Sequence, residues 1–165
     1  MIKAIIYHSN TGHTMAYAKL LSESLNLPYY SLKEAPSNLK KEDEVIYLSW
    51  ICAGVITKLK KVSQTYKIKC IGMVGAYPNT DKYLKELQKN NGFTIPSFYL
   101  QGGIDYSKLK GFKKLIVKAI GKTISKENTE LVNLFQNGGN YVKKENLEEL
   151  IKYVKTQINS QSMDE

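Results

Sequence analysis

The 165-residue chain contains no arginine, and all 24 of its Lys and Arg positions are lysine. Proteins that read a DNA sequence normally use the planar arginine fork on guanine edges and phosphates. The absence of arginine therefore argues against sequence-specific recognition of nucleic acid, even though the formal net charge is +9. Lysines still create a positive field, which acidic partners or anionic lipid would feel.

Cysteine and histidine are also scarce, with two residues of each. Cys52 and Cys70 lie in or beside apolar runs and form no CxxC motif, so we expect reduced, structural thiols. With only His8 and His13 besides, no familiar spacing of metal ligands can be assembled. The sequence therefore predicts no metal site.

Long apolar runs are missing as well. No run approaches the ~18 residues of a membrane span, and the apolar run at the N-terminus is too short for a signal peptide. We therefore expect a cytoplasmic protein. The composition, 42% hydrophobic and 24% charged, is typical of one globular domain with a sizeable core. We expect this domain to cover residues 1–159 and the polar tail at 160–165 to be disordered.

Short apolar runs alternate with amphipathic ones along the chain. They predict strands at 2–7, 29–32, 44–49, 70–75 and 97–100, and helices at 14–25, 57–65, 81–90 and 146–158. This alternation is typical of βαβ units, and hence of an α/β fold whose mostly parallel sheet is covered on both faces. In such sheets, ligands bind beyond the carboxyl ends of the strands.

The segment at about 105–140, before the last helix, interrupts the alternation and contains two further helical patterns, at 106–121 and 126–136. The first pattern is expected to place six apolar residues on one face: Leu109, Phe112, Leu115, Ile116, Ala119 and Ile120. Lysines fill the rest of that helix. Peripheral contact with an anionic membrane through Tyr106 to Lys122 is one role for this insert, and the wall of a substrate pocket is a second. A packed insert with a solvated lysine face is the third.

A polar loop between the first strand and the first helix is the strongest candidate site. It consists of Ser9, Asn10, Thr11, Gly12, His13 and Thr14. Hydroxyls, a glycine and the amide groups of a helix N-terminus together suit a phosphate. The loop contains no lysine, so we expect hydrogen bonds and the helix dipole, rather than an ion pair, to hold the anion. A hydroxyl-rich turn that only caps the helix is the alternative.

The known phosphate motifs narrow the ligand. GxxxxGK[ST] and GxGxxG are absent, and a phosphatase loop would need an arginine. A strand followed by S-x-T-G-x-T and a helix resembles the loop that holds the phosphate of FMN in flavodoxins. A phosphate dianion beside His13 would raise the pKa of its imidazole, whereas a solvent-facing His13 would have no role.

The resemblance to flavodoxins covers most of the chain. It implies FMN as the cofactor and a single doubly wound, five-stranded parallel sheet with the strand order 2-1-3-4-5. It also implies that the loops after the third and fourth strands carry the flavin ring. These loops contain Trp50, Ile51, Cys52, Ala53 and Gly54, and Gly75, Ala76 and Tyr77. Trp50 and Tyr77 either stack on the ring or serve as an edge plug and a turn residue.

By the same resemblance, the Ala53-Gly54 peptide would flip when the flavin is reduced, because glycine makes a positive φ cheap. The alternative is that Gly54 starts the next helix. The segment that begins at Gln101, with Gly102 and Gly103, resembles the branch that contains flavodoxin-like protoporphyrinogen oxidases, which carry an insert at this place. The two glycines would let the backbone approach the flavin or form a tight turn.

The charge departs from the resemblance, because electron-carrier flavodoxins are generally acidic. Lysines such as Lys58, Lys60 and Lys61 should raise the flavin potential and favour redox partner proteins with acidic docking surfaces. Three functions stay open: an FMN-containing electron carrier, an FMN-dependent oxidoreductase acting on a quinone or porphyrinogen-like substrate, and a flavin-free regulatory domain.

Overall fold

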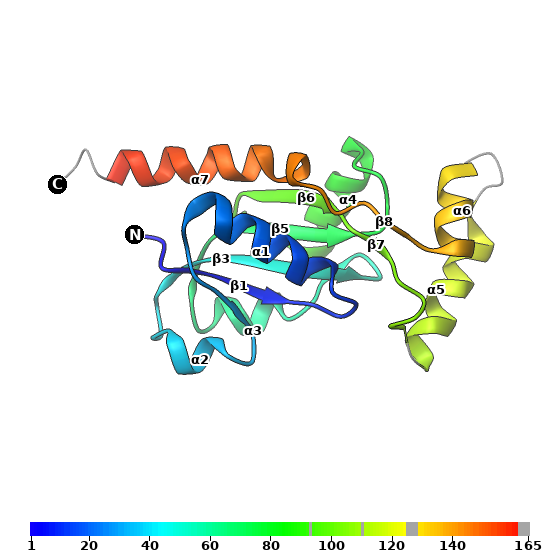
Figure 1. The fold of residues 1–165 in the computed structure, drawn as a ribbon, viewed down its shortest axis with the longest axis horizontal. Helices are drawn as coiled ribbons and strands as arrows, with labels where there is room; N and C mark the ends of the chain where they lie inside the picture. Colours follow the sequence, from blue (N-terminus) through cyan, green and yellow to red (C-terminus); the bar gives the residue numbers. More distant parts are fainter. Residues whose placement is uncertain (93, 110, 125–128, 162–165) are drawn as a thin grey trace.

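A computed structural model gives the fold and describes residues 1–92, 94–109, 111–124 and 129–161. Its central sheet has parallel strands in the order β2-β1-β3-β5-β6. These strands are β1 (Ala4–His8), β2 (Tyr29–Ser31), β3 (Glu44–Cys52), β5 (Lys67–Gly75) and β6 (Ser97–Gln101). When these five parallel strands are numbered along the chain, their order is 2-1-3-4-5. The arrangement (Figure 1) thus confirms the doubly wound sheet that the resemblance to flavodoxins implies.

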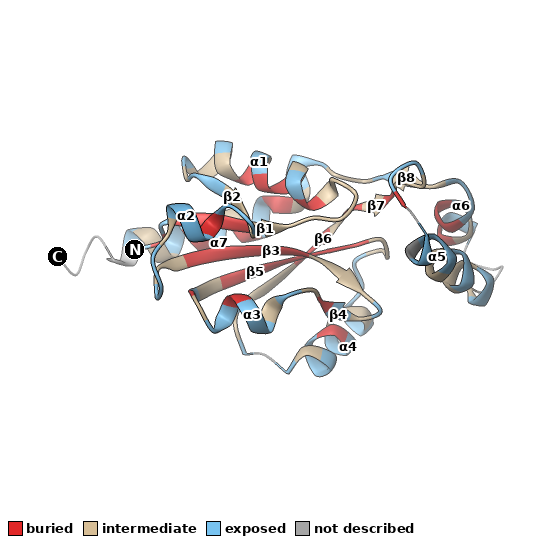
Figure 2. Cartoon of the chain, turned by 90° about the horizontal axis from the view of Figure 1, so that it is seen from below, coloured by how far each residue is buried: buried red, intermediate tan, exposed pale blue. Residues whose placement is uncertain are grey.

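Helices cover both faces of this sheet (Figure 2). One face carries α1 (His13–Leu25), the short η1 (Lys144–Leu147) and α7 (Glu148–Gln161). The other face carries α2 (Ala35–Asn38), α3 (Leu59–Ser63) and α4 (Asp81–Asn91). α4 begins after an N-cap residue, Thr80, whose hydroxyl accepts a hydrogen bond of 3.3 Å from the Tyr83 amide.

Alternation along β3 divides the core into two halves. Ile46 and Leu48 pack with α1 and α7, whereas Val45 and Tyr47 pack with α2, α3 and α4. All four side chains are fully buried. A slip of one residue would exchange the two faces, so burial on both sides holds the register. The sheet is therefore a firm base for the loops at its carboxyl ends.

The chain after β3 differs from the prediction of a helix over 57–65. It first forms β4 (Val55–Ile56), antiparallel to β3, and only then the five-residue α3. Ala53 and Gly54 have φ angles of 49° and 77° and make the tight hairpin turn that reverses the chain. Gly54 therefore belongs to a turn and does not start a helix. The carbonyl oxygen of Thr57 accepts hydrogen bonds of 2.7 and 2.8 Å from two hydroxyls of β3, which override the local helical pattern.

The segment before the last helix forms a separate helical insert. A two-stranded antiparallel ribbon of β7 (Gly103–Ile104) and β8 (Gly139–Asn140) forms its base. Between these strands lie α5 (Phe112–Thr123) and α6 (Thr129–Asn137). Figure 1 shows both helices beyond the carboxyl ends of the strands, at the end of the molecule opposite the two chain termini.

α5 begins later than the pattern over 106–121 predicts. Asp105 Oδ1 accepts hydrogen bonds from the amide and the hydroxyl of Ser107, at 3.0 and 2.5 Å. Such local bonding offers the backbone an alternative to a helix. Leu109 accordingly lies before the helix, where it is buried in the core of the insert.

The apolar side chains of α5 lie on two faces rather than on the single face that the sequence predicts. Val117 and Ile120 pack against the core of the insert. Phe112 and Leu115, in contrast, are 75% and 65% exposed. The prediction of one common face is wrong because the inner contact of α5 is centred on Val117, which the predicted face omits.

Two predictions reach beyond the described residues. The helix predicted over 126–136 starts within residues 125–128, which lie outside the described part, and the structure describes α6 from Thr129. α7 extends to Gln161, so the first two residues of the predicted tail at 160–165 are helical, and residues 162–165 lie outside the described part. No described helix combines the length and the apolar character that crossing a membrane requires.

Candidate functional site

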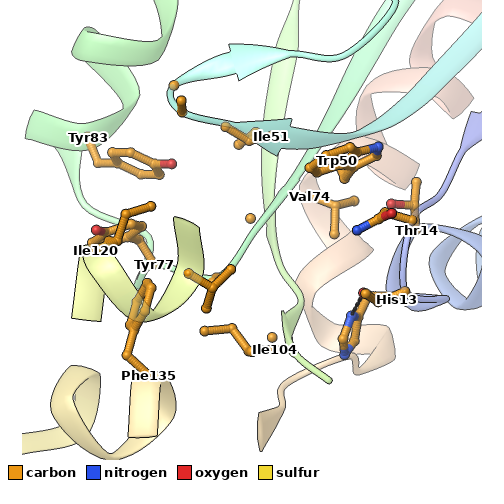
Figure 3. Close-up of a pocket in the computed structure, with 18 of the residues that line it drawn as sticks. His13, Thr14, Trp50, Ile51, Val74, Tyr77, Tyr83, Ile104, Ile120 and Phe135 are labelled. Atoms are coloured by element: carbon orange, nitrogen blue, oxygen red, sulfur yellow. Dashed lines mark hydrogen bonds between the residues drawn. The ribbon is translucent and has the colours of Figure 1, made fainter. Parts of the chain in front are cut away.

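A cavity of about 580 Å³ opens beyond the carboxyl ends of the strands, between the sheet and the helical insert (Figure 3). It is lined by loops that follow β1, β3 and β5, by α4, and by α5 and α6. Twelve of the sixteen site residues that the sequence predicts line it: Asn10, Thr11, His13, Thr14, Trp50, Ile51, Ala53, Gly54, Gly75, Ala76, Tyr77 and Gly103. The fold thus brings together residues from four separate stretches of chain.

The other four predicted residues do not line the cavity, and two of them shape its loops. The Ser9 hydroxyl accepts a hydrogen bond of 3.1 Å from the Gly12 amide and closes the loop on itself. Gly12 has a φ of 104° at the N-cap of α1, a conformation that favours glycine. Gly102 donates to the Gly75 carbonyl at 2.7 Å, and Cys52 ends β3 opposite Val55.

The N-terminus of α1 presents hydrogen-bond donors to the cavity. Its first amide groups have no acceptor within the helix. Thr14 is only 1% exposed, and it lines the cavity. Thr11 Oγ1 lies 3.0 Å from His13 Nδ1. An anion at this position would accept hydrogen bonds from the helix amide groups and from these hydroxyls.

A cation from another part of the chain reaches this loop, whose own sequence contains no lysine. Lys108, which precedes α5, places its Nζ 3.4 Å from the position that a Cβ on Gly12 would take. It also pairs with Asp105 at 3.3 Å. Burial lowers the pKa of His13, Asp105 opposes that shift, and Lys108 adds to it. Sequence reasoning missed Lys108 because it lies on the insert, far along the chain from the loop.

The hairpin after β3 is held from α4. The side-chain amide of Asn91 donates to the Gly54 carbonyl at 2.9 Å, and its oxygen accepts from the Ile56 amide at 2.8 Å. A Cβ on Gly54 would lie 2.9 Å from Asn90 Nδ2, so this turn has little space for a side chain. Asn91 therefore fixes the conformation of the turn that carries Ala53 into the cavity wall.

An aromatic cluster forms the wall opposite Trp50 (Figure 3). The Tyr77 ring lies 5.2 Å from that of Tyr83 on α4 and 5.6 Å from that of Phe135 on α6. The Tyr99 hydroxyl donates to the Tyr77 carbonyl at 2.6 Å and sets its position. Ring pairs at such distances add to the stabilisation from burial. Trp50 and Tyr77 thus border the cavity from opposite sides.

Several lining residues were absent from the predicted set. They include Tyr83 and Asn90 on α4, and Ile104, Val117, Ile120 and Phe135 of the insert. Tyr83 had a signal, since α4 directly follows the loop after β5. The sequence suggests the helix at 106–122 as a pocket wall, but nothing in its spacing tells which of its side chains face the cavity.

A buried polar network ties the insert to α1. Tyr17 is fully buried, and its hydroxyl donates to the Gln101 carbonyl at 2.6 Å. Asn146 donates to that hydroxyl at 2.5 Å and to the Tyr141 carbonyl at 3.0 Å. Both ends of the insert are therefore anchored beside the helix whose N-terminus faces the cavity.

Comparison with known families fits this geometry. A model of the flavodoxin domain family matches residues 4–131, whereas no curated protein matches the chain. The matched span includes all the strands of the parallel sheet, the α1 loop, the hairpin after β3 and α5. It covers well over half of the 165 residues. The chain therefore belongs to the flavodoxin domain family.

Proposed function

We propose that this protein binds FMN and transfers electrons through the flavin. The observation that carries the proposal is the division of the cavity into two chemically different ends (Figure 3). One end has the α1 N-terminus and the Thr14 hydroxyl, and the other has apolar and aromatic walls around Tyr77. FMN is divided in the same way, into a charged phosphate and a flat ring. The flavodoxin domain family typically binds this cofactor.

The residues present fit both parts of FMN. Thr11, Thr14 and the loop amides would hold the phosphate oxygens. Trp50, Ile51 and Tyr77 would border the ring and exclude water from it. When bound, the flavin supplies the redox chemistry by accepting electrons from one partner and passing them to another. The carbonyl of Gly54 is already held by Asn91, so the turn beside the ring is pre-organised.

A second candidate function is an FMN-dependent oxidoreductase acting on a quinone or porphyrinogen-like substrate. The specific observation that favours it is the wall of Val117, Ile120 and Phe135, which the insert adds to the cavity. An electron carrier needs no such wall. An apolar surface beside the ring would instead suit a flat, apolar substrate. Quinone reduction that is lost in Ile120→Asp while FMN binding persists would favour the enzyme.

The test of FMN binding compares FMN with riboflavin, which lacks the phosphate. We expect the wild-type protein to bind FMN more tightly than riboflavin, as measured by quenching of flavin fluorescence. Thr14→Val removes one hydroxyl at nearly constant shape and should weaken FMN binding about tenfold while leaving riboflavin binding unchanged.

Thr65→Val is the matched control, since Thr65 lies after α3 with its hydroxyl bonded to the Lys61 carbonyl. This variant should bind FMN as the wild type does. Failure of the wild-type protein to bind FMN would overturn the proposal, as would equal affinity for FMN and riboflavin.

We also propose that the redox partners present acidic docking surfaces. Lys58, Lys60 and Lys61 are exposed just after the hairpin that borders the cavity. A cluster of like charges beside the site raises the rate of encounter with an oppositely charged partner.

Cys52 and Cys70 are unpaired, and this supports a reducing compartment such as the cytoplasm.

The outer face of α5 supports a further proposal, peripheral contact with an anionic membrane. Phe112 and Leu115 are exposed there, and Lys114, Lys118 and Lys122 are exposed on the same helix. Steps of four residues place these lysines in a row along the helix. An apolar row beside a basic row matches the interface of an anionic bilayer, where acyl chains cover the first and headgroups pair with the second.

A further inference from the structure

The loop before α1 lacks a cation of its own, and the helical insert brings one to it. Lys108 Nζ lies 3.4 Å from the position of a Cβ on Gly12, at the turn that starts α1. Residue 12 is a glycine with a φ of 104°, so it places no side chain of its own in this space. The ammonium group therefore lies beside the N-cap of α1, next to loop residues that line the cavity, although Lys108 itself is not a lining residue.

The present partner of Lys108 is a weak one. Its Nζ pairs with Asp105 Oδ2 at 3.3 Å, with side chains 60% and 30% exposed. Ion pairs of this exposure contribute little, because water solvates both groups. Asp105 is in addition held by Ser107, through its amide and its hydroxyl. Lys108 can therefore exchange Asp105 for a stronger anion without leaving Asp105 unsatisfied.

The position of Lys108 is set by its neighbour in sequence. Leu109 is buried in the core of the insert with Ile104 and Leu134, so the backbone at this point is fixed. The lysine stem spans the short distance from that anchor to Gly12. The charge at the loop consequently depends on how the insert packs, and not on the loop.

We propose that Lys108 is the cationic ligand of the FMN phosphate, delivered to the α1 loop by the helical insert. The inference rests on the proposed FMN site and adds a residue to it. A doubly charged phosphate attracts an ammonium more strongly than a single carboxylate does, so Lys108 turns from Asp105 toward the phosphate. Hydroxyls and amides orient the phosphate, and Lys108 supplies the charge.

The test measures dissociation constants for FMN and riboflavin in the wild-type protein, in Lys108→Gln and in Lys19→Gln. Lys19 is exposed on α1 and controls for the loss of one positive charge. We expect Lys108→Gln to weaken FMN binding about three- to tenfold, an effect that salt reduces, with riboflavin binding unchanged. Lys19→Gln should match the wild type. In the opposite direction, Asp105→Asn should leave FMN binding equal or tighter, because it removes a competing carboxylate.

The outcomes separate the two proposals. A wild-type protein that binds FMN no more tightly than riboflavin overturns the phosphate site and the role of Lys108 together. A wild-type protein that prefers FMN, with Lys108→Gln keeping the full preference, overturns the role of Lys108 alone. Weaker FMN binding in both Lys108→Gln and Asp105→Asn would also overturn it, because the pair would then be structural.

Discussion

The central sheet and the helical insert bury their apolar residues differently. In the sheet, Ile46 and Leu48 are inaccessible on one face, and Val45 and Tyr47 are inaccessible on the other. The insert has its own small core, but α5 leaves Phe112 75% exposed. The sheet is thus a scaffold enclosed by its helices, whereas the insert is attached along one side only. The inner side of the insert completes the cavity, and its outer side is exposed and available for contact with a membrane or a partner.

The largest expected effect comes from making the same substitution in both regions. Leu48→Ala leaves a cavity between β3 and the α1 and α7 layer, so it should lower the free energy of unfolding by about 3 kcal/mol. Leu115→Ala removes a side chain that is 65% exposed and should lower it by less than about 0.5 kcal/mol. Urea denaturation followed by circular dichroism measures both. Equal losses would contradict the distinction between scaffold and insert.

The ribbon that joins the two regions should be the next most sensitive point. A Cβ on Gly103 would lie 2.1 Å from the Gly139 carbonyl oxygen, at a φ of 144°. Gly103→Ala should therefore cost about 2 kcal/mol and loosen the insert selectively. Hydrogen exchange should quicken in α5 and α6 and stay slow in β3 and β5. Gly92→Asn is the control. A side chain at this position has open space, and asparagine tolerates the positive φ of residue 92, so hydrogen exchange should be unchanged.

The outer side of α5 offers a smaller effect. Replacing Phe112 and Leu115 together by serine should weaken sedimentation with anionic vesicles about tenfold without lowering stability, since both side chains are exposed. Met15→Ser, at a 48% exposed position of α1, is the matched control and should sediment normally. Equal binding of the wild-type protein to neutral vesicles would contradict the membrane contact. The membrane contact would also be contradicted if the double variant bound vesicles as well as the wild type does but bound an acidic protein less well, because the outer face of α5 would then be a protein-docking surface.

The smallest expected effect is a pH dependence at the contact between the regions. Burial lowers the pKa of His13, so its imidazole is easier to protonate in the unfolded chain than in the folded one. The stability that neutral His13 contributes is present above its unfolded pKa of about 6.5 and is lost as the pH falls below it. His13→Asn should flatten this loss in urea denaturation from pH 7 to 5.

An NMR titration gives a second readout of the same contact. Lys108→Gln removes a nearby positive charge, so the pKa of His13 should rise, whereas Asp105→Asn should lower it further. Identical titration curves for these variants and the wild type would show that the insert does not reach the loop in solution.

Local pattern was sufficient for most of the scaffold. The apolar runs predicted the parallel strands of the sheet, and the run before Ser9 placed the α1 loop at the end of the first one. The hairpin at Ala53 and Gly54 was missed, because its hydrogen bonds go to Asn91 and to β3, both distant in sequence. The inner face of α5 was missed for a similar reason, since both faces carry apolar side chains and only packing distinguishes them.

The sequence by itself determined the α/β sheet, the hydroxyl-rich loop before α1 and the family resemblance, because strand alternation and a short motif are local properties. Only the tertiary structure decided which charge lies beside that loop. Lys108 and Gly12 meet because β7, β8 and the buried Leu109 bring the insert back over the strand ends. Long-range packing sets such contacts, and no spacing of residues along a chain encodes them alone.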